Sequence, residues 1–196
     1  MLSSDSSLSN VAGLALAVAV VTLVGLALLI LMWVFRSGPL GILNDICNGA
    51  GALLSVGLAL ALYKQHQGPS QQLALPALIA VIVGALIAIV GSALVMSGTT
   101  GFFLAGMYTA TGYALIGLWL LAFNYGNLGH PGPVTLGLIT GVVMALGLAA
   151  IPSIFMGIDA FKDAAWHTWL GQVGFAGWAI LYPIWCLRLW HLLRMM

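Results

Sequence analysis

The sequence predicts an all-α integral membrane protein, a polytopic bundle of about six transmembrane helices. Hydrophobic residues make up 62% of the 196 residues and charged residues only 5%, whereas soluble domains carry about 25% charged residues. The chain contains six apolar runs, each long enough for a helix that crosses a hydrocarbon core, which takes about 20 residues. Glycine, proline and polar residues separate these runs, as expected for tight turns at the membrane surface.

The predicted helices occupy nearly the whole chain. They cover residues 10–35, 40–63, 73–96, 102–125, 134–156 and 165–193. Residues 1–9 are predicted to form a disordered polar leader, and residues 10–196 a single transmembrane domain. Because the leader contains no Lys or Arg and a long apolar run follows it, we interpret that run as a retained helix rather than a signal peptide. Any site must therefore lie among the helices or in short loops.

The distribution of charge bears on partners and on orientation. The net charge is +1 and no basic cluster is present, which argues against nucleic acid as a partner because phosphate binding needs several clustered cations. An even number of helices places both termini on one side, with Lys64, Arg188 and Arg194; Arg36 and Lys162 lie on the other side. The positive-inside rule then favours cytoplasmic termini, by three charges to two.

A possible internal repeat links successive helix pairs. A shift of 60 residues places Gly38, Gly41 and Gly57 on glycines at 98, 101 and 117, and a looser shift of about 122 relates the second helix to the sixth. The repeating unit would be a two-helix hairpin used three times. The alternative is a chance alignment of helices rich in Gly, Ala and Leu.

The fifth helix carries the clearest packing signal. Small residues recur every four positions and would form one groove, which lets helix backbones approach closely in lipid. The groove could seat another helix of this chain, a second subunit, or a flat ligand such as a lipid tail or pigment, and we expect the first. Its residues are Gly137, Gly141, Ala145, Ala149, Ser153 and Gly157.

Two prolines are predicted to kink the last two helices. Pro152 and Pro183 lie inside the fifth and sixth apolar runs, and each removes one backbone hydrogen bond. Such kinks can open space for a ligand, although they also occur in membrane helices that bind nothing.

Polar side chains gather at one end of the bundle, where each needs an explanation because polar groups are costly in a membrane. They lie at the end opposite the termini, in the second, fourth and sixth helices. We predict that they form a ligand-binding pocket made of Asn44, Asp45, Asn48, Tyr108, His167 and Gln172.

A metal site at the same end is a further hypothesis. Asp159, Asp163 and His167 are spaced by four, so on a continuous helix they would share a face. Two carboxylates and an imidazole, with Asp45 as a fourth ligand, could hold a divalent metal. The competing interpretation is an ordinary surface turn in which Asp163 caps the sixth helix and Trp166 and Trp169 mark the membrane interface.

Two features that the sequence lacks restrict the range of functions we expect. No Lys, Arg, Asp or Glu stands near the centre of a predicted helix, which argues against a proton pump or a retinal protein. No recognised catalytic or nucleotide-binding motif occurs. We therefore expect a non-catalytic membrane protein, either a subunit or scaffold of a membrane assembly, including self-association, or a binder of lipid or another hydrophobic cofactor. The alternatives are a small transporter or channel that uses the polar pocket, and an intramembrane metal-dependent enzyme.

Overall fold

The computed structural model describes residues 2–65, 71–128 and 132–195. Within them, six helical segments are long and apolar enough to cross a membrane, and no strand is present. This confirms the all-α bundle, and the chain is an integral membrane protein. The first four segments are single helices: α1 (Leu2–Phe35), α2 (Gly38–Gln65), α3 (Gln71–Met96) and α4 (Phe102–Gly126).

The last two segments are each broken into three pieces. The fifth comprises α5 (Val134–Ala145), the 3₁₀ segment η1 (Leu146–Ala150) and α6 (Ile151–Phe155). The sixth comprises α7 (Trp166–Ala176), the π-helical segment η3 (Gly177–Leu181) and α8 (Tyr182–Arg194). A 3₁₀ turn, η2 (Phe161–Asp163), lies between α6 and α7. The irregular segments η1 and η3 each lie in the turn just before a proline, Pro152 and Pro183 respectively. A proline removes a helical hydrogen bond, and its ring displaces the backbone of the preceding turn.

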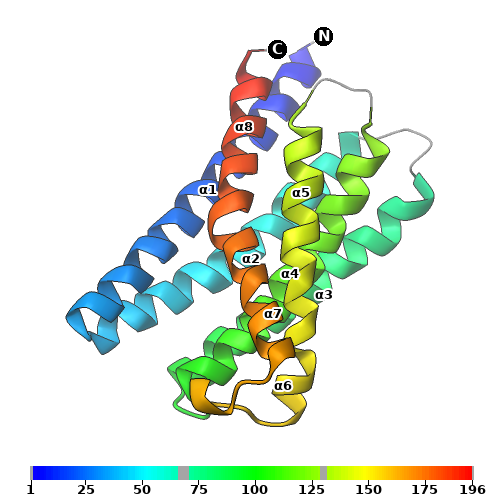
Figure 1. Ribbon diagram of the computed structural model, residues 1–196. Helices are drawn as coiled ribbons and strands as arrows, with labels where there is room; N and C mark the ends of the chain where they lie inside the picture. The colour runs from blue at the N-terminus through cyan, green and yellow to red at the C-terminus, as the bar shows by residue number, and fades with distance from the viewer. Residues whose placement is uncertain (1, 66–70, 129–131, 196) are drawn as a thin grey trace.

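Helix α4 is the centre of the bundle. Two-thirds (67%) of its most apolar stretch is buried, against 22% for α3 and 28% for α1. It packs against α3 on one side and against α5 on the other, with α7 also in contact, while α8 packs beside α1. The two termini lie at the same end of the molecule (Figure 1). At the opposite end, the turn between α1 and α2 splays away from the remaining helices, and we call residues 29–48 the α1–α2 tip.

Glycine pairs hold α3, α4 and α5 at close range. A Cβ on Gly84 of α3 would collide with the carbonyl oxygen of Gly112 on α4, and the reverse is also true. A Cβ on Gly117 of α4 would lie 3.0 Å from the carbonyl oxygen of Gly141 on α5. Backbone contact at this range is how helices associate where lipid removes the hydrophobic driving force.

The small residues of the predicted groove pack against other helices of this chain, but their spacing by four does not persist. Gly137 and Gly141 are buried against α4. Beyond them the buried positions fall three apart, because a 3₁₀ helix has about three residues per turn; they are Met144, Gly147, Ala150 and Ser153. Ala145 and Ala149 are only half-buried, and Gly157 is exposed in the turn after α6, with φ +63°. The groove therefore divides between α4 and α7 and is not left open to a flat ligand.

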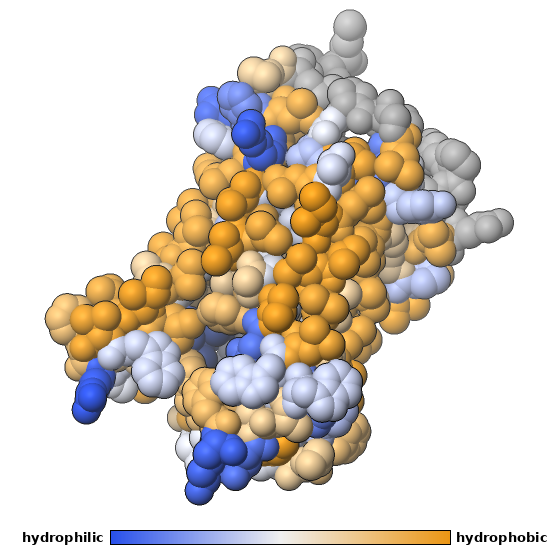
Figure 2. Space-filling model, in the orientation of Figure 1, coloured by the Kyte–Doolittle hydropathy of each residue, from blue (hydrophilic) through white to orange (hydrophobic). Residues whose placement is uncertain are grey.

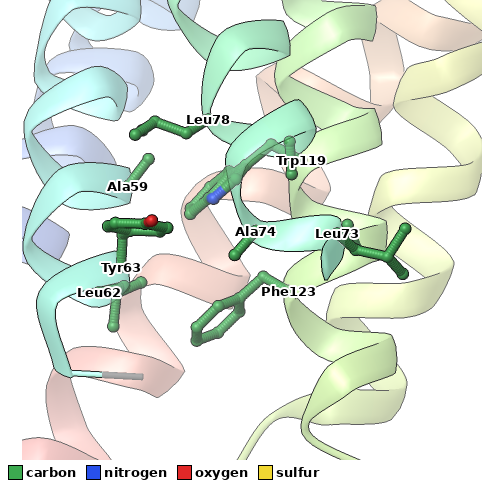
Figure 3. A pocket seen from close by; sticks show the side chains of 10 residues that line it. Ala59, Leu62, Tyr63, Leu73, Ala74, Leu78, Trp119 and Phe123 are labelled. Carbon is green, nitrogen blue, oxygen red and sulfur yellow. The ribbon is translucent and has the colours of Figure 1, made fainter. Parts of the chain in front are cut away.

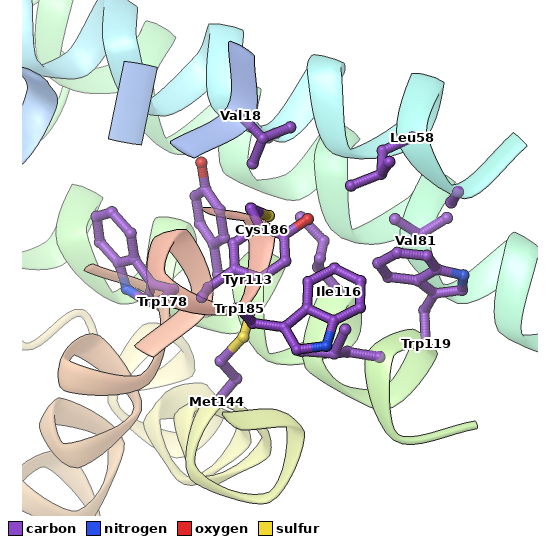
Figure 4. Packing of buried hydrophobic residues seen from close by; sticks show 14 of the residues in the cluster. Val18, Leu58, Val81, Tyr113, Ile116, Trp119, Met144, Trp178, Trp185 and Cys186 are labelled. Atoms are coloured by element: carbon purple, nitrogen blue, oxygen red, sulfur yellow. The ribbon is translucent and has the colours of Figure 1, made fainter. Parts of the chain in front are cut away.

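Aromatic side chains fill the core where α4 meets α8. Tyr113, Tyr182 and Trp185 are at most 1% exposed, and Figure 4 shows Tyr113 and Trp185 among the aliphatic residues of this cluster. Trp119 meets Trp185 edge to face, with ring centroids 6.3 Å apart. Both cysteines, Cys47 and Cys186, are free thiols.

Helix α1 begins earlier than predicted. It starts at Leu2, so residues 2–9, which the sequence analysis assigned to a disordered leader, continue the membrane helix. Once a helix is nucleated in the membrane, each further residue adds a hydrogen bond without a new nucleation cost, so a polar extension can follow. The predicted polar loops at 64–70 and 126–133 fall partly outside the described residues, and the three-hairpin repeat stays a prediction.

Candidate ligand-binding cavity

A cavity of about 210 Å³ opens between the α1–α2 tip and the α4–α7 side of the bundle. Figure 2 shows a hollow at this place, with hydrophilic residues inside it, hydrophobic residues above it and pale residues of intermediate hydropathy along its lower rim. Its walls come from α1, α2, α4, η2, α7 and η3. The lining residues are Leu29, Trp33, Asn44, Asp45, Asn48, Phe102, Phe103, Gly106, Thr109, Ala110, Phe161, Gln172, Phe175 and Trp178.

The structure brings together four of the six residues predicted to form the polar pocket. Asn44, Asp45 and Asn48 line the cavity from α2, and Gln172 lines it from α7. Tyr108 does not line the cavity although it lies on α4; its neighbour Thr109 does so instead. His167 is also elsewhere, bonded to Ser153 on α6. A one-residue step rotates a helix by about 100°, so correct depth does not ensure that a side chain points into the cavity.

Asp45 is buried without a cationic partner. Its side chain is 6% exposed, and within the described residues it forms no ion pair. Its one hydrogen bond there comes from Asn44 Nδ2 at 3.5 Å, longer than the roughly 2.7–3.2 Å of a good N–H···O bond. A carboxyl group held this way has acceptor capacity directed at the cavity and unmet by the protein.

The amide side chains beside Asp45 lie where α1 packs closely against α2. A Cβ on Gly25 of α1 would lie 3.1 Å from the Cβ of Cys47, which shows how closely the two helices approach, and 3.7 Å from Oδ1 of both Asn44 and Asn48, an ordinary contact distance. The hydroxyl of Tyr113 donates a hydrogen bond of 2.9 Å to the backbone carbonyl of Asn48. Across the cavity, Gln172 Nε2 has only a long contact of 3.9 Å with Met107 Sδ. Amide groups on two walls can therefore rotate toward a guest.

Aromatic rings form most of the remaining wall. Trp33 on α1 meets Phe102 on α4 edge to face, with centroids 6.4 Å apart, and so bridges the mouth. The floor is the indole of Trp178, which stacks on Tyr113 at 4.5 Å and 13°. These rings were not predicted as site residues, because apolar residues in a membrane helix give no signal that separates a lipid-facing side chain from a cavity wall.

A second, more open hollow adjoins the first. It has a volume of about 510 Å³ and lies between the α1–α2 tip and the end of α3. Trp33, Asp45 and Phe102 line both spaces. The outer hollow is otherwise apolar, with Met32, Ile42, Val95 and Met96 among its residues. The pair of spaces thus runs from an apolar outside to a polar inside.

The predicted metal ligands do not come together. The segment from Asp159 to Ala165 is not one helix, since it contains only the short turn η2 and α7 begins at Trp166; the shared face therefore does not form. Asp159 instead accepts hydrogen bonds from the backbone N–H groups of Gly101 at 2.6 Å and Leu104 at 2.9 Å, at the start of α4. Across the described residues, no three His, Cys, Asp or Glu side chains are grouped closely enough to hold a metal ion.

His167 belongs to a small hydroxyl cluster. Its Nδ1 lies 3.2 Å from Ser153 Oγ, which is 2.8 Å from Thr168 Oγ1. Ser153 and Thr168 are 0% exposed. These contacts join α6 to α7.

A further hollow lies near the end that holds the termini, between α2, α3 and α4 (Figure 3). Its walls include Tyr63, Leu73, Trp119 and Phe123, and its volume is only about 40 Å³. Ligand pockets for drug-sized molecules measure about 300–1,000 Å³. This hollow is a packing gap, and the cavity beside Asp45 is the stronger candidate site.

Comparisons with known proteins add no assignment. No family model matches this chain, and no curated protein and no solved structure shows significant similarity to it.

Proposed function

We propose that this protein binds an amphipathic lipid of the surrounding membrane, with the lipid head in the cavity beside Asp45 and its chain in the outer hollow. The observation that carries this proposal is the placement of a buried, underbonded carboxyl group and three amides in a cavity that opens sideways between helices. A sideways opening is reached from the lipid phase. Polar groups inside and apolar groups outside match an amphipath that enters head first.

The volume supports a head group rather than a whole molecule. The inner cavity, at about 210 Å³, is smaller than the roughly 300–1,000 Å³ of sites for complete drug-sized ligands. Asp45 lies two turns inside α2, which is roughly 10 Å along the helix axis. This depth is close to the membrane interface, where lipid heads meet their chains. If both termini are cytoplasmic, as the charge distribution favours, the lipid belongs to the outer leaflet.

Binding is better supported than transport through the bundle. The cavity ends on Trp178, which stacks on Tyr113, and the core beyond contains Tyr182 and Trp185, both 0% exposed. These rings occupy the route toward the end with the termini. A transporter that uses this site would have to move several buried aromatic side chains.

Photo-crosslinking with a neutral lipid tests the proposal. The probe is a diacylglycerol with a diazirine near its head group, presented in nanodiscs. We expect crosslinks in peptides that contain residues 102–110 and 172–178. Gly106 lines the cavity, and a Cβ there would meet nothing within 4 Å. Gly106→Leu should therefore fill the cavity and reduce these crosslinks at least five-fold without disturbing the helices.

Gly13→Leu is the matched control. Gly13 is also a helical glycine with nothing within 4 Å of an added Cβ, but it lies on α1 near the terminal end. Its crosslinking should equal that of the wild type. Crosslinks that are spread evenly over the lipid-facing helices, or that persist in Gly106→Leu, would overturn the proposal.

A further inference from the structure

We infer that the head group taken by this cavity is cationic, an ammonium or substituted amine, and that Asp45 is its counter-ion. This inference rests on the proposed function and specifies its ligand class. It starts from the unmatched charge: a carboxylate in a low-dielectric site is expensive unless a cation or several donors accompany it. The described residues supply one long hydrogen bond from Asn44 and no cation.

The cations at this end of the molecule do not fill that role. Arg36 follows α1 and Lys162 lies in η2, and both are exposed. Neither lines the cavity. His167 also lies at this end, but its imidazole contacts the hydroxyl of Ser153. The space in front of Asp45 is therefore open to a positive charge that the protein does not itself provide.

The aromatic wall supports the same ligand class. Trp33, Phe102 and Trp178 line the same cavity as the carboxyl group. The faces of aromatic rings attract cations, and cages of such rings recognise quaternary ammonium groups. The combination of several rings with a single carboxyl group fits a soft, bulky cation, because rings offer a divalent metal ion no ligand atoms and such sites usually contain more than one carboxylate.

An anionic head is disfavoured by the same groups. A lipid phosphate without a cationic portion would bring a second negative charge next to Asp45, and no Lys or Arg lines the cavity to offset the repulsion. Neutral heads could use Asn48 and Gln172, but they would leave the carboxyl group unpaired. Charge complementarity therefore distinguishes cationic, neutral and anionic amphipaths that carry the same alkyl chain.

Competition against the neutral photo-lipid tests the inference. The competitors are dodecyltrimethylammonium, dodecanol and dodecanoate, with tetramethylammonium to show whether the ion alone suffices. In wild-type protein we expect dodecyltrimethylammonium to halve crosslinking at a concentration at least ten-fold below that of dodecanol. Dodecanoate should be weakest, and tetramethylammonium should compete poorly because it lacks the chain.

Asp45→Asn should abolish the ten-fold preference for the cation, and its elution from size-exclusion chromatography in detergent should match that of the wild type, which shows that the variant is folded. Asp45→Glu should restore part of the preference. Asp163→Asn is the matched control, since Asp163 is an exposed carboxylate outside the cavity, and it should behave as wild type.

Equal competition by the cation and dodecanol in wild type, or an unchanged preference in Asp45→Asn, would overturn the cationic assignment while leaving lipid binding intact. Absence of competition by any amphipath, with crosslinks unaffected by Gly106→Leu, would instead refute the proposed function.

Discussion

The hydroxyl of Tyr182 on α8 donates a hydrogen bond of 3.0 Å to Ser55 Oγ on α2, although the two residues lie 127 positions apart. Ser55 in turn donates to the backbone carbonyl of Gly51 at 2.8 Å. Both side chains are 0% exposed. Together with the bond from Tyr113 to Asn48, this relay fixes α2, and with it Asp45, against α4 and α8.

The two ends of this hydrogen bond should not contribute equally. Tyr182→Phe removes a donor, but Ser55 keeps its bond to Gly51, so we expect a loss of about 0.6 kcal/mol, the average for hydrogen bonds between membrane helices. Ser55→Ala leaves the buried Tyr182 hydroxyl without its partner, which costs about 1–3 kcal/mol. Unfolding in mixed micelles of dodecyl sulfate and a neutral detergent measures both. The double variant should be no less stable than Ser55→Ala; a strictly additive loss would contradict the bond.

The contact between Gly84 and Gly112 should tolerate no side chain. A methyl group on Gly84 would collide with the carbonyl oxygen of Gly112, so Gly84→Ala should separate α3 from α4 and reduce stability by about 1–3 kcal/mol. Gly13→Ala is the control, since nothing lies within 4 Å of its added methyl group. It should leave stability unchanged or raise it by up to about 1 kcal/mol, because alanine favours helix. Equal effects of the two substitutions in the same unfolding assay would refute the close approach.

Asp159 should stabilise the first turn of α4 from outside that helix. Its carboxylate accepts from the N–H groups of Gly101 and Leu104, which would otherwise be unpaired at a helix N-terminus. Asp159→Ala should destabilise this turn by about 1 kcal/mol, the usual cost of losing a cap. Hydrogen exchange of peptides that cover residues 101–105 should then be roughly five-fold faster. Asp163→Ala should not change this exchange, and acceleration by both variants would point to a general loosening of the segment.

The membrane orientation predicted from the charge distribution can be tested by labelling introduced cysteines. Lys64 and Lys162 are both exposed and lie at opposite ends of the bundle. With cytoplasmic termini, Lys162→Cys should react with a membrane-impermeant maleimide in intact cells, and Lys64→Cys should react only after lysis. The unsubstituted chain gives the background from its two native thiols, of which Cys186 is buried. The reverse pattern would place the cavity in the cytoplasmic leaflet.

The candidate site was predicted from the sequence through the cost of burying polar groups. Asn44, Asp45, Asn48 and Gln172 stood out because polar groups are expensive in a membrane, and they do line one cavity. Tyr108 and His167 were chosen on the same ground but lie elsewhere, since depth along a helix does not determine which way a side chain points. The proposed metal group assumed a helix through Asp159, and the chain is irregular there.

The sequence by itself determined the class of the protein. Its composition and the lengths of its apolar runs are sufficient for six membrane helices, because in lipid every backbone polar group must be bonded within its own segment. Only the tertiary structure decided where space is left. The placement of Trp33 and Trp178 around Asp45, beside the splayed α1–α2 tip, depends on contacts between residues far apart in the chain. Such contacts depend on helix rotation and crossing angle, which apolar sequence leaves open because every face of a lipid-embedded helix is hydrophobic.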